Sequence, residues 1–275
     1  MTVTIGVVGT GNMGSALVKG WMRSPLPGTK VVVYDKINEC VRRLVDDWSL
    51  SAEGLVSVAD SLEDLVKQTG VIVVVVKPKD TPEVLSALSH HVRPDQVVIS
   101  SAAGLGLSRL RAALGPGPSL YRIMPNLGVE LGAGVVAVCA EPGVVPADID
   151  RVKDLFGCMG IVEVVDEQML NAVTAVAGSS LGFLALALEG LEDGAVKVGM
   201  PRKLARTFVR QTALATAQLL VMRPGSAADL KDQVASPGGT TIAGLAVLED
   251  EGVRGAFLRA VEAATERGRV LQEEV

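Results

Sequence analysis

The chain has 275 residues and a mass of 28.5 kDa, enough for one large or two ordinary domains. A net charge of −5 and a sequence pI of about 5.2 argue against a nucleic-acid-binding surface, and the chain has no basic run. Apolar residues make up 48% of the chain and aromatic residues only 3%, which favours a soluble protein with a core of Val, Leu and Ala.

Membrane, secretory and metal-binding classes find little support in the sequence. The densest apolar run, 71–76, is far too short to span a membrane, and residues 1–20 lack a charged leader and a cleavage pattern. Cys40, Cys139 and Cys158 have neither the spacing of a metal site nor an even number for disulfides. We therefore expect a cytoplasmic protein without a metal.

The chain begins with a dinucleotide-binding fingerprint. A β-rich run at 3–8 leads into Gly9-Thr10-Gly11-Asn12-Met13-Gly14, which opens a helix. This is G-x-G-x-x-G in its required setting, directly after a strand and at the start of a helix. Gly9 is expected to make the turn, Gly11 to let a pyrophosphate approach the backbone, and Gly14 to allow close packing of helix on strand.

The second predicted strand, 31–34, ends at an acidic residue. Asp35 lies about twenty residues beyond the glycines, where a carboxylate binds the ribose hydroxyls of NAD. Lys36 follows directly and is suited instead to the 2′-phosphate of NADP. The pair leaves NAD and NADP both open.

Short Val/Ile-rich runs alternate with helical patterns over the first ~165 residues, which predicts a doubly wound parallel α/β sheet. The expected strands are 3–8, 31–34, 71–76, 97–100, 119–123, 134–139 and 161–165, and the expected helices are 12–23, 38–47, 60–68, 81–91, 107–114 and 147–158.

Three predicted strand ends carry further candidate cofactor residues, because ligands of such sheets bind beyond the carboxyl ends of the strands. They are Lys77-Pro78, Ala102-Ala103-Gly104 and Asn126. Lys77 is suited to oxygens of cofactor or substrate, and Asn126 to the nicotinamide carboxamide or the substrate. The two histidines, His90 and His91, fall at the end of a predicted helix and are expected to cap it rather than to catalyse.

From Asp166 onward every segment has helical periodicity, so we expect domains at 1–165 and 166–275. Gly199 and Pro201 separate two long helices, and Ser226 with Asp229 resembles a capping box. The helix around 181–191 is apolar on most faces, and a small helical domain has little room to bury it. We therefore predict a homodimer through this domain.

The most informative segment lies near the C-terminus. A helical pattern at 227–234 is cut by Ser236-Pro237-Gly238-Gly239, and Thr240-Thr241 then open another helix, with Thr240 as the expected N-cap. The N–H groups and positive dipole end of that helix suit a small carboxylate.

Together these motifs resemble pyrroline-5-carboxylate reductase over nearly the whole chain. The resemblance rests on Gly9–Gly14, the Lys77-Pro78 and Ala102–Gly104 strand ends, Met124-Pro125-Asn126, and the block from Leu230 to Glu249, with Asp193–Pro201 in support. It implies a Rossmann domain followed by an all-α dimerisation domain, often assembled into rings of dimers. The implied reaction is the reduction of a cyclic imine to proline by NADPH or NADH, the last step of proline biosynthesis.

The resemblance also implies a substrate site at the Ser236–Thr241 turn, which includes Gly238. The Ser236 hydroxyl with the N–H groups of Gly239 and Thr240 would bind the carboxylate, and Thr241 would bind the ring nitrogen as the catalytic residue. The chain departs from the family pattern at Ala177 and Leu181, where serine and proline are usual, and at Leu127-Gly128, where Thr-Pro is common. These departures leave open a reductase of another cyclic imine, and a non-catalytic nucleotide-binding relative is the further alternative.

Overall fold

The structure is a computed structural model that describes residues 3–24, 28–48 and 54–274. The chain divides into two compact units. The first contains residues 1–178 together with 264–275, and the second contains residues 179–263. The last helix, α12 (Val253–Glu274), contributes residues to both units.

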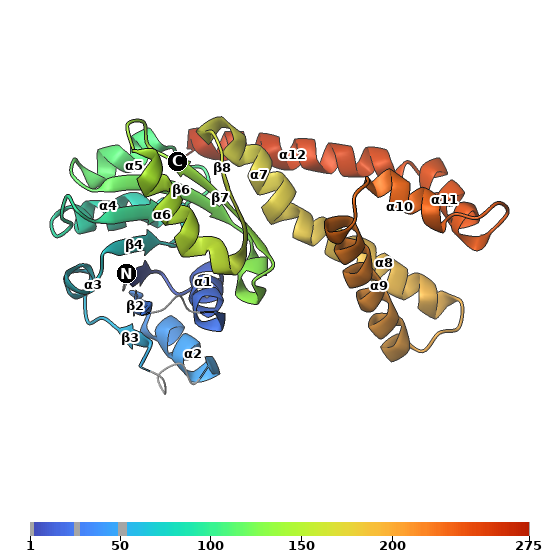
Figure 1. Cartoon of the computed structure of the whole chain (residues 1–275), viewed down its shortest axis with the longest axis horizontal. Coiled ribbons are helices and arrows are strands. Elements are labelled where there is room, and N and C mark those ends of the chain that lie inside the picture. The colour runs from blue at the N-terminus through green and yellow to red at the C-terminus, as the bar shows by residue number, and fades with distance from the viewer. Residues whose placement is uncertain (1–2, 25–27, 49–53, 275) are drawn as a thin grey trace. The chain divides into compact units, whose positions relative to one another are not determined.

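The first unit is built on one sheet of eight strands in the order β3-β2-β1-β4-β5-β6-β7-β8. The chain runs outward from β1 to β3 on one side, and returns to β4 and continues on the other, as Figure 1 shows. The strands are β1 (Thr4–Val8), β2 (Lys30–Tyr34), β3 (Val56–Val58), β4 (Val71–Val74), β5 (Val97–Ser100), β6 (Ser119–Pro125), β7 (Gly134–Ala140) and β8 (Gly160–Val164).

Helices cover both faces of this sheet and give it two separate cores. The α helices of the unit that follow the strands are α1 (Asn12–Arg23), α2 (Asn38–Trp48), α3 (Leu62–Gln68), α4 (Thr81–Ser89), α5 (Leu107–Leu114) and α6 (Pro146–Phe156). Trp21 of α1 and Phe156 of α6 pack in the core on one face, with their rings 5.5 Å apart. Leu65 of α3, Leu88 of α4 and Leu110 of α5 pack in the core on the other.

The predicted doubly wound sheet is confirmed, with two differences. The short strand β3 was not predicted, since Val56-Ser57-Val58 is too brief to establish a period. The pair β6–β7 is antiparallel, whereas the other pairs of the sheet are parallel. Only the short 3₁₀ segment η3 (Leu127–Leu131) joins these two strands, and a parallel return needs a crossover of a dozen or more residues.

The first unit ends in an irregular helix. It begins with η5 (Glu167–Met169) and α7 (Leu170–Val173) and widens into a π-helical turn, η6 (Thr174–Ser179). The turn is followed directly by α8 (Ser180–Lys197), and because Leu181 is not a proline the helix continues through this position. Isolated π turns within α helices are frequently found at functional sites.

The second unit is entirely helical in the residues described. After α8 come α9 (Arg202–Met222), α10 (Ala227–Val234) and α11 (Thr240–Asp250). The predicted helix boundary at Gly199 and Pro201 is confirmed, with Pro201 as N-cap of α9. The predicted capping box is also present, because Ser226 and Asp229 bond each other's backbone N–H groups.

This unit leaves many large apolar side chains in contact with solvent. Leu184, Leu186 and Leu191 of α8 are 56%, 70% and 60% exposed, and Phe208 of α9 is 53% exposed. The stretch Glu167–Lys197 is long and apolar enough to cross a membrane, and only 11% of its apolar window is buried. By length and composition alone, then, this surface is suited either to a partner subunit or to lipid.

Candidate active site

The fingerprint loop lies between the carboxyl ends of β1 and β4, where the strand order reverses. The Gly9 N–H donates to the Tyr34 carbonyl at 2.8 Å, and the Val75 N–H donates to the Val8 carbonyl at 2.8 Å. A side chain at Gly14 would have its Cβ only 2.0 Å from the Gly9 carbonyl oxygen, so the close approach of α1 to the loop requires glycine there.

The same loop is open where a ligand would approach. Gly11 is the N-cap of α1, it is exposed, and nothing lies within 4 Å of the point where its side chain would begin. No acidic residue occurs in the first turn of α1, which contains the exposed Asn12 and the half-buried Met13. A helix N-terminus with unhindered backbone N–H groups suits a pyrophosphate. The residues present therefore fit a dinucleotide.

Asp35 is bonded to the fingerprint loop, which the sequence did not predict. Its Oδ2 accepts from the Thr10 backbone N–H at 2.7 Å and from the Thr10 hydroxyl at 3.2 Å. Its Oδ1 accepts from the Ile37 N–H at 2.9 Å. Lys36 is exposed, and its Nζ lies 3.7 Å from Oδ1 of Asp80. Asp35 thus fixes the loop, and its contact with a ribose stays a prediction.

The remaining predicted strand ends divide between exposed and packed positions. Lys77 is exposed and is the N-cap of η2 (Pro78–Asp80), directly beyond β4. Ala102 is buried, and its N–H donates to the Ser100 hydroxyl at 3.3 Å. Ala103 is half-buried. A Cβ at Gly104 would lie 3.2 Å from the Leu271 carbonyl of α12, so this glycine serves packing.

Asn126 is almost fully buried and has three partners within the protein. Its Nδ2 donates to the Ala177 carbonyl in the π turn at 2.9 Å. Its Oδ1 accepts from the N–H groups of Gly128 and Val135, both at 3.1 Å. The predicted contact with nicotinamide or substrate can therefore use only the second N–H of this amide, and the main role seen here is to join β6, β7 and η6.

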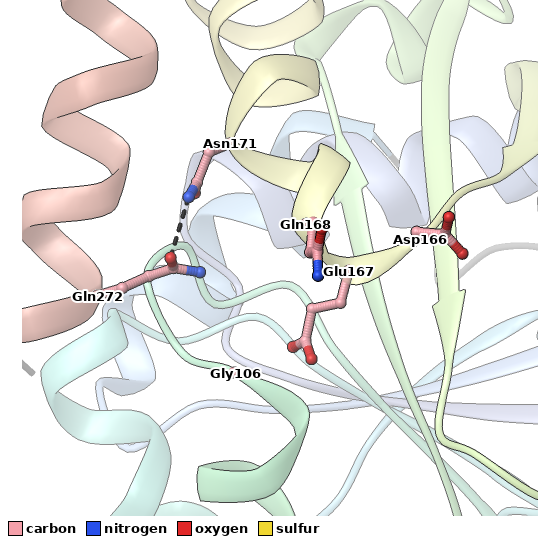
Figure 2. Close-up of a pocket in the computed structure, with 6 residues that line it drawn as sticks. All are labelled: Gly106, Asp166, Glu167, Gln168, Asn171 and Gln272. Atoms are coloured by element: carbon pink, nitrogen blue, oxygen red, sulfur yellow. Dashed lines mark hydrogen bonds between the residues drawn. The ribbon is translucent and has the colours of Figure 1, made fainter.

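A second buried polar contact anchors the start of the irregular helix. Arg122 of β6 is 2% exposed and donates to Glu167 at 2.6 Å, and the N–H of Leu107 donates to the same carboxylate oxygen at 2.6 Å. A cavity of about 540 Å³ lies beside this pair, and Figure 2 shows its polar lining. Asn171 donates to Gln272 across it at 3.0 Å. The residues that line it are Gly106, Asp166, Glu167, Gln168, Asn171 and Gln272.

The C-terminal turn belongs to the helical unit and has the predicted form with a shift of one residue. Gly239, not Thr240, is the N-cap of α11, and Thr240 is the first helical residue. The Gly239 N–H donates to the Ser236 carbonyl at 3.0 Å, so it is engaged in the turn rather than directed at a ligand as predicted. Helix geometry leaves the N–H groups of the first turn, from Thr240 onward, without intrahelical partners.

The two glycines of this turn have distinct roles. Gly238 has φ +65°, in the left-handed region that favours glycine. A Cβ at Gly239 would lie 2.3 Å from the Ser236 hydroxyl oxygen, so its absence lets that hydroxyl lie over the start of α11. Thr241, half-buried, follows in the first turn. The turn thus presents a hydroxyl and a helix N-terminus together.

Two of the three cysteines, Cys139 and Cys158, are poorly suited to act as nucleophiles. Burial raises the pKa of the Cys139 and Cys158 thiols, which keeps both protonated at neutral pH. His90 is the C-cap of α4 and His91 follows it, as predicted. Within residues 3–24, 28–48 and 54–274, no group of three or more His, Cys, Asp or Glu is placed to hold a metal ion.

Comparison with known proteins connects both units to one family. A family model described as pyrroline-5-carboxylate reductase dimerisation matches residues 167–271, and one described as NADP oxidoreductase coenzyme F420-dependent matches residues 4–104. The pyrroline-5-carboxylate reductase of Escherichia coli K12 is 34% identical over 99% of this chain and all of its own length. The chain belongs to the pyrroline-5-carboxylate reductase family. It is accordingly an NAD(P)-dependent reductase.

Solved structures agree with this membership. The pyrroline-5-carboxylate reductase of Streptococcus pyogenes is 31% identical, with a TM-score of 0.84 over 98% of both chains. The pyrroline carboxylate reductase of Plasmodium falciparum, solved with NADP bound, is 27% identical, also with a TM-score of 0.84 over 98% of both chains. The predicted order of a Rossmann-type domain and a helical dimerisation domain is confirmed.

The dimerisation domain accounts for the apolar surface of the helical unit. The matched residues, 167–271, include the stretch of membrane-spanning length and every residue of the second unit. In this family, therefore, the exposed leucines of α8 are suited to a second protein chain rather than to lipid.

Proposed function

We propose that this chain reduces 1-pyrroline-5-carboxylate to L-proline by hydride transfer from NADPH or NADH, as a soluble cytoplasmic enzyme of proline biosynthesis. The observation that carries the proposal is the turn at Ser236–Thr241, where a hydroxyl lies over the N-terminus of α11. A carboxylate-bearing substrate suits such a turn, and the relatives that match the full chain are named for this reaction.

The proposed cofactor site lies in the first unit, where the strand order of the sheet reverses between β1 and β4. The backbone N–H groups at Gly11, Asn12 and Met13 would hold the pyrophosphate, with Gly9 and Gly14 setting the loop. Asp35 and Lys36 would contact the adenosine ribose. The strand ends Lys77-Pro78 and Ala102-Ala103-Gly104 would border the rest of the cofactor, with the second N–H of Asn126 as one further donor.

The proposed substrate site is the first turn of α11, in the second unit. The Ser236 hydroxyl and the N–H groups of Thr240 and Thr241 would bind the carboxylate, while Gly238 and Gly239 give the turn its shape. The Thr241 hydroxyl would hydrogen-bond the ring nitrogen.

The proposed reaction asks little of side-chain acids and bases. A bound nicotinamide supplies the hydride, and a pyrroline with a protonated nitrogen is already an activated electrophile. The carboxylate clamp fixes which ring carbon is presented, and Thr241 orients the nitrogen and assists its proton exchange. Orientation of this kind can lower a barrier by about 7–11 kcal/mol.

We also propose that the chain works as a homodimer through its dimerisation domain, and that dimers assemble further into a ring. The exposed apolar side chains of α8 and α9 support the dimer.

The test of the reaction is oxidation of NADPH and NADH by the purified chain with pyrroline-5-carboxylate, beside the same assay with the six-membered homologue. We expect turnover of the five-membered ring. Turnover of the larger ring alone would overturn the substrate assignment. It would indicate that the departures at Ala177 and Leu181 change the substrate preference. Cofactor binding without turnover of either ring would instead favour the non-catalytic relative.

Replacement of Thr241 tests the proposed catalytic contact. Thr241→Ala removes the hydroxyl and is expected to lower kcat/KM by more than about tenfold, because the ring nitrogen loses its orienting partner. Thr241→Ser keeps a hydroxyl and is the matched control, expected to retain most of the activity. The dissociation constant of the cofactor should be the same in all three proteins. Near-normal kinetics of the alanine variant would remove Thr241 from the mechanism.

A further inference from the structure

The structure fixes one carboxylate beyond the end of β2, where a Rossmann fold generally receives the adenosine ribose of its cofactor. Asp35 follows the last residue of β2, and both of its oxygens accept hydrogen bonds from the backbone around it. The Thr10 N–H at 2.7 Å and the Ile37 N–H at 2.9 Å hold the carboxylate in place. The group is therefore pre-positioned rather than free to swing away from a ligand.

The bonds to Asp35 leave room for a hydroxyl donor but not for an anion. A carboxylate has about four acceptor positions, and Thr10 and Ile37 occupy three of them. A ribose 2′-hydroxyl can donate to the remaining one. A 2′-phosphate carries about two negative charges and no donor at neutral pH, so it would meet a fixed like charge.

The neighbouring lysine does not cancel this preference. Lys36 Nζ lies 3.7 Å from the Asp80 carboxylate, and its side chain is 68% exposed. The cation therefore has an acidic partner on η2 and remains largely in solvent, where its attraction for a phosphate is screened. Lys79, also on η2, is exposed as well. Of these charged groups, Asp35 is the one that backbone hydrogen bonds hold in place.

We propose that Asp35 is the specificity-determining residue of the cofactor site, and that the chain takes NADH in preference to NADPH. This inference rests on the proposed function, because it concerns the cofactor site of that reaction. Thr10 acts with Asp35 as a positioning residue, since its N–H and hydroxyl both bind the same carboxylate oxygen.

Direct binding tests the preference without relying on catalysis. Dissociation constants of NADH and NADPH are measured by calorimetry on the full-length protein without an imine. We expect NADH to bind at least about tenfold more tightly than NADPH, because a fixed like charge close to the phosphate opposes only the latter. Equal or tighter binding of NADPH would overturn the inference and leave the proposed function standing. Binding of neither cofactor would overturn both.

Two variants separate the carboxylate charge from its role in the loop. Asp35→Asn keeps an oxygen that accepts from Thr10 and removes the charge, so NADPH binding should improve at least about tenfold while the protein remains folded. Asp80→Asn is the matched control. It removes one negative charge from the partner of Lys36 and leaves Asp35 intact, so NADH should still be preferred. A loss of preference in Asp80→Asn, with none in Asp35→Asn, would assign the selection to Lys36.

Discussion

At the scale of single residues, Tyr121 of β6 offers the clearest prediction. Its hydroxyl is buried and has no hydrogen-bond partner in the described structure, and burial, with Asp148 contributing, raises its pKa to about 12. Tyr121→Phe removes a polar atom that the fold leaves unsatisfied. We expect the free energy of unfolding to stay the same or rise by about 1 kcal/mol.

The same substitution changes the response to high pH. A raised pKa in the folded state means that stability is lost as pH rises from about 10, where an exposed tyrosine ionises, towards about 12. Urea unfolding across this range should therefore show a loss for the wild type that Tyr121→Phe lacks. Tyr121→Leu leaves a cavity and is expected to lower stability by about 1–3 kcal/mol, which controls for packing of the ring. A destabilised phenylalanine variant would reveal a partner for the hydroxyl.

How much of the site follows from the sequence differs from residue to residue. The role of Gly14 was predictable, because only glycine permits so close an approach of the helix to the loop. The bonds of Thr10 to Asp35 were not, because they join positions 25 apart through side-chain geometry that no period reveals. Asn126 was predicted to bind the cofactor, but the sequence could not show that Ala177 takes one of its N–H groups.

At the scale of elements, Asn126 connects the end of β6 to the π turn, η6. Asn126→Ala removes a donor to Ala177 and an acceptor for Gly128 and Val135 in a buried place. We expect the free energy of unfolding to fall by about 2–3 kcal/mol. Asn126→Asp keeps the acceptor for Gly128 and Val135, but it loses the donor and sets a carboxylate oxygen against the Ala177 carbonyl, so it tests the bond to η6 separately.

Hydrogen exchange shows which element each role supports. Both variants should lose amide protection in the residues of η6, whereas protection at Gly128 and Val135 should fall only in Asn126→Ala. Unchanged exchange in η6 would mean that the π turn holds its form without this bond, and that Asn126 serves β6 and β7 alone.

The elements themselves were largely predictable, because repeated Val/Ile runs between helical patterns have few alternatives. The antiparallel direction of β7 was not predicted, although the short connection through η3 is too brief for a parallel return. The shift of the α11 N-cap from Thr240 to Gly239 has a physical cause as well. A threonine side chain is the usual cap, but here the Ser236 hydroxyl lies over the helix start and only glycine leaves room for it.

At the scale of the whole molecule, the helical unit is suited to association. Its helices expose large apolar side chains along their length, and 11% burial over the most apolar window of Glu167–Lys197 is far below what a core helix requires. The sequence predicted a dimer from this imbalance, since a helix without a polar face must be covered. Residues 167–271 match a dimerisation domain, so the surface that covers this helix is expected to be a second copy of the chain.

Leu186 of α8, 70% exposed, tests this surface. Leu186→Glu places a charge where a second chain is expected to pack, so the dimer should weaken by at least about tenfold in its dissociation constant. Sedimentation over a range of concentrations, without detergent, measures the effect. Val145→Glu is the matched control, because Val145 is 55% exposed at the start of α6 in the cofactor-binding unit. A wild type that stays in solution only with detergent would favour lipid over a second chain. If both variants sediment like the wild type, the dimer contact does not include this face of α8. The dimer would then have to form through α9, where Phe208 is exposed.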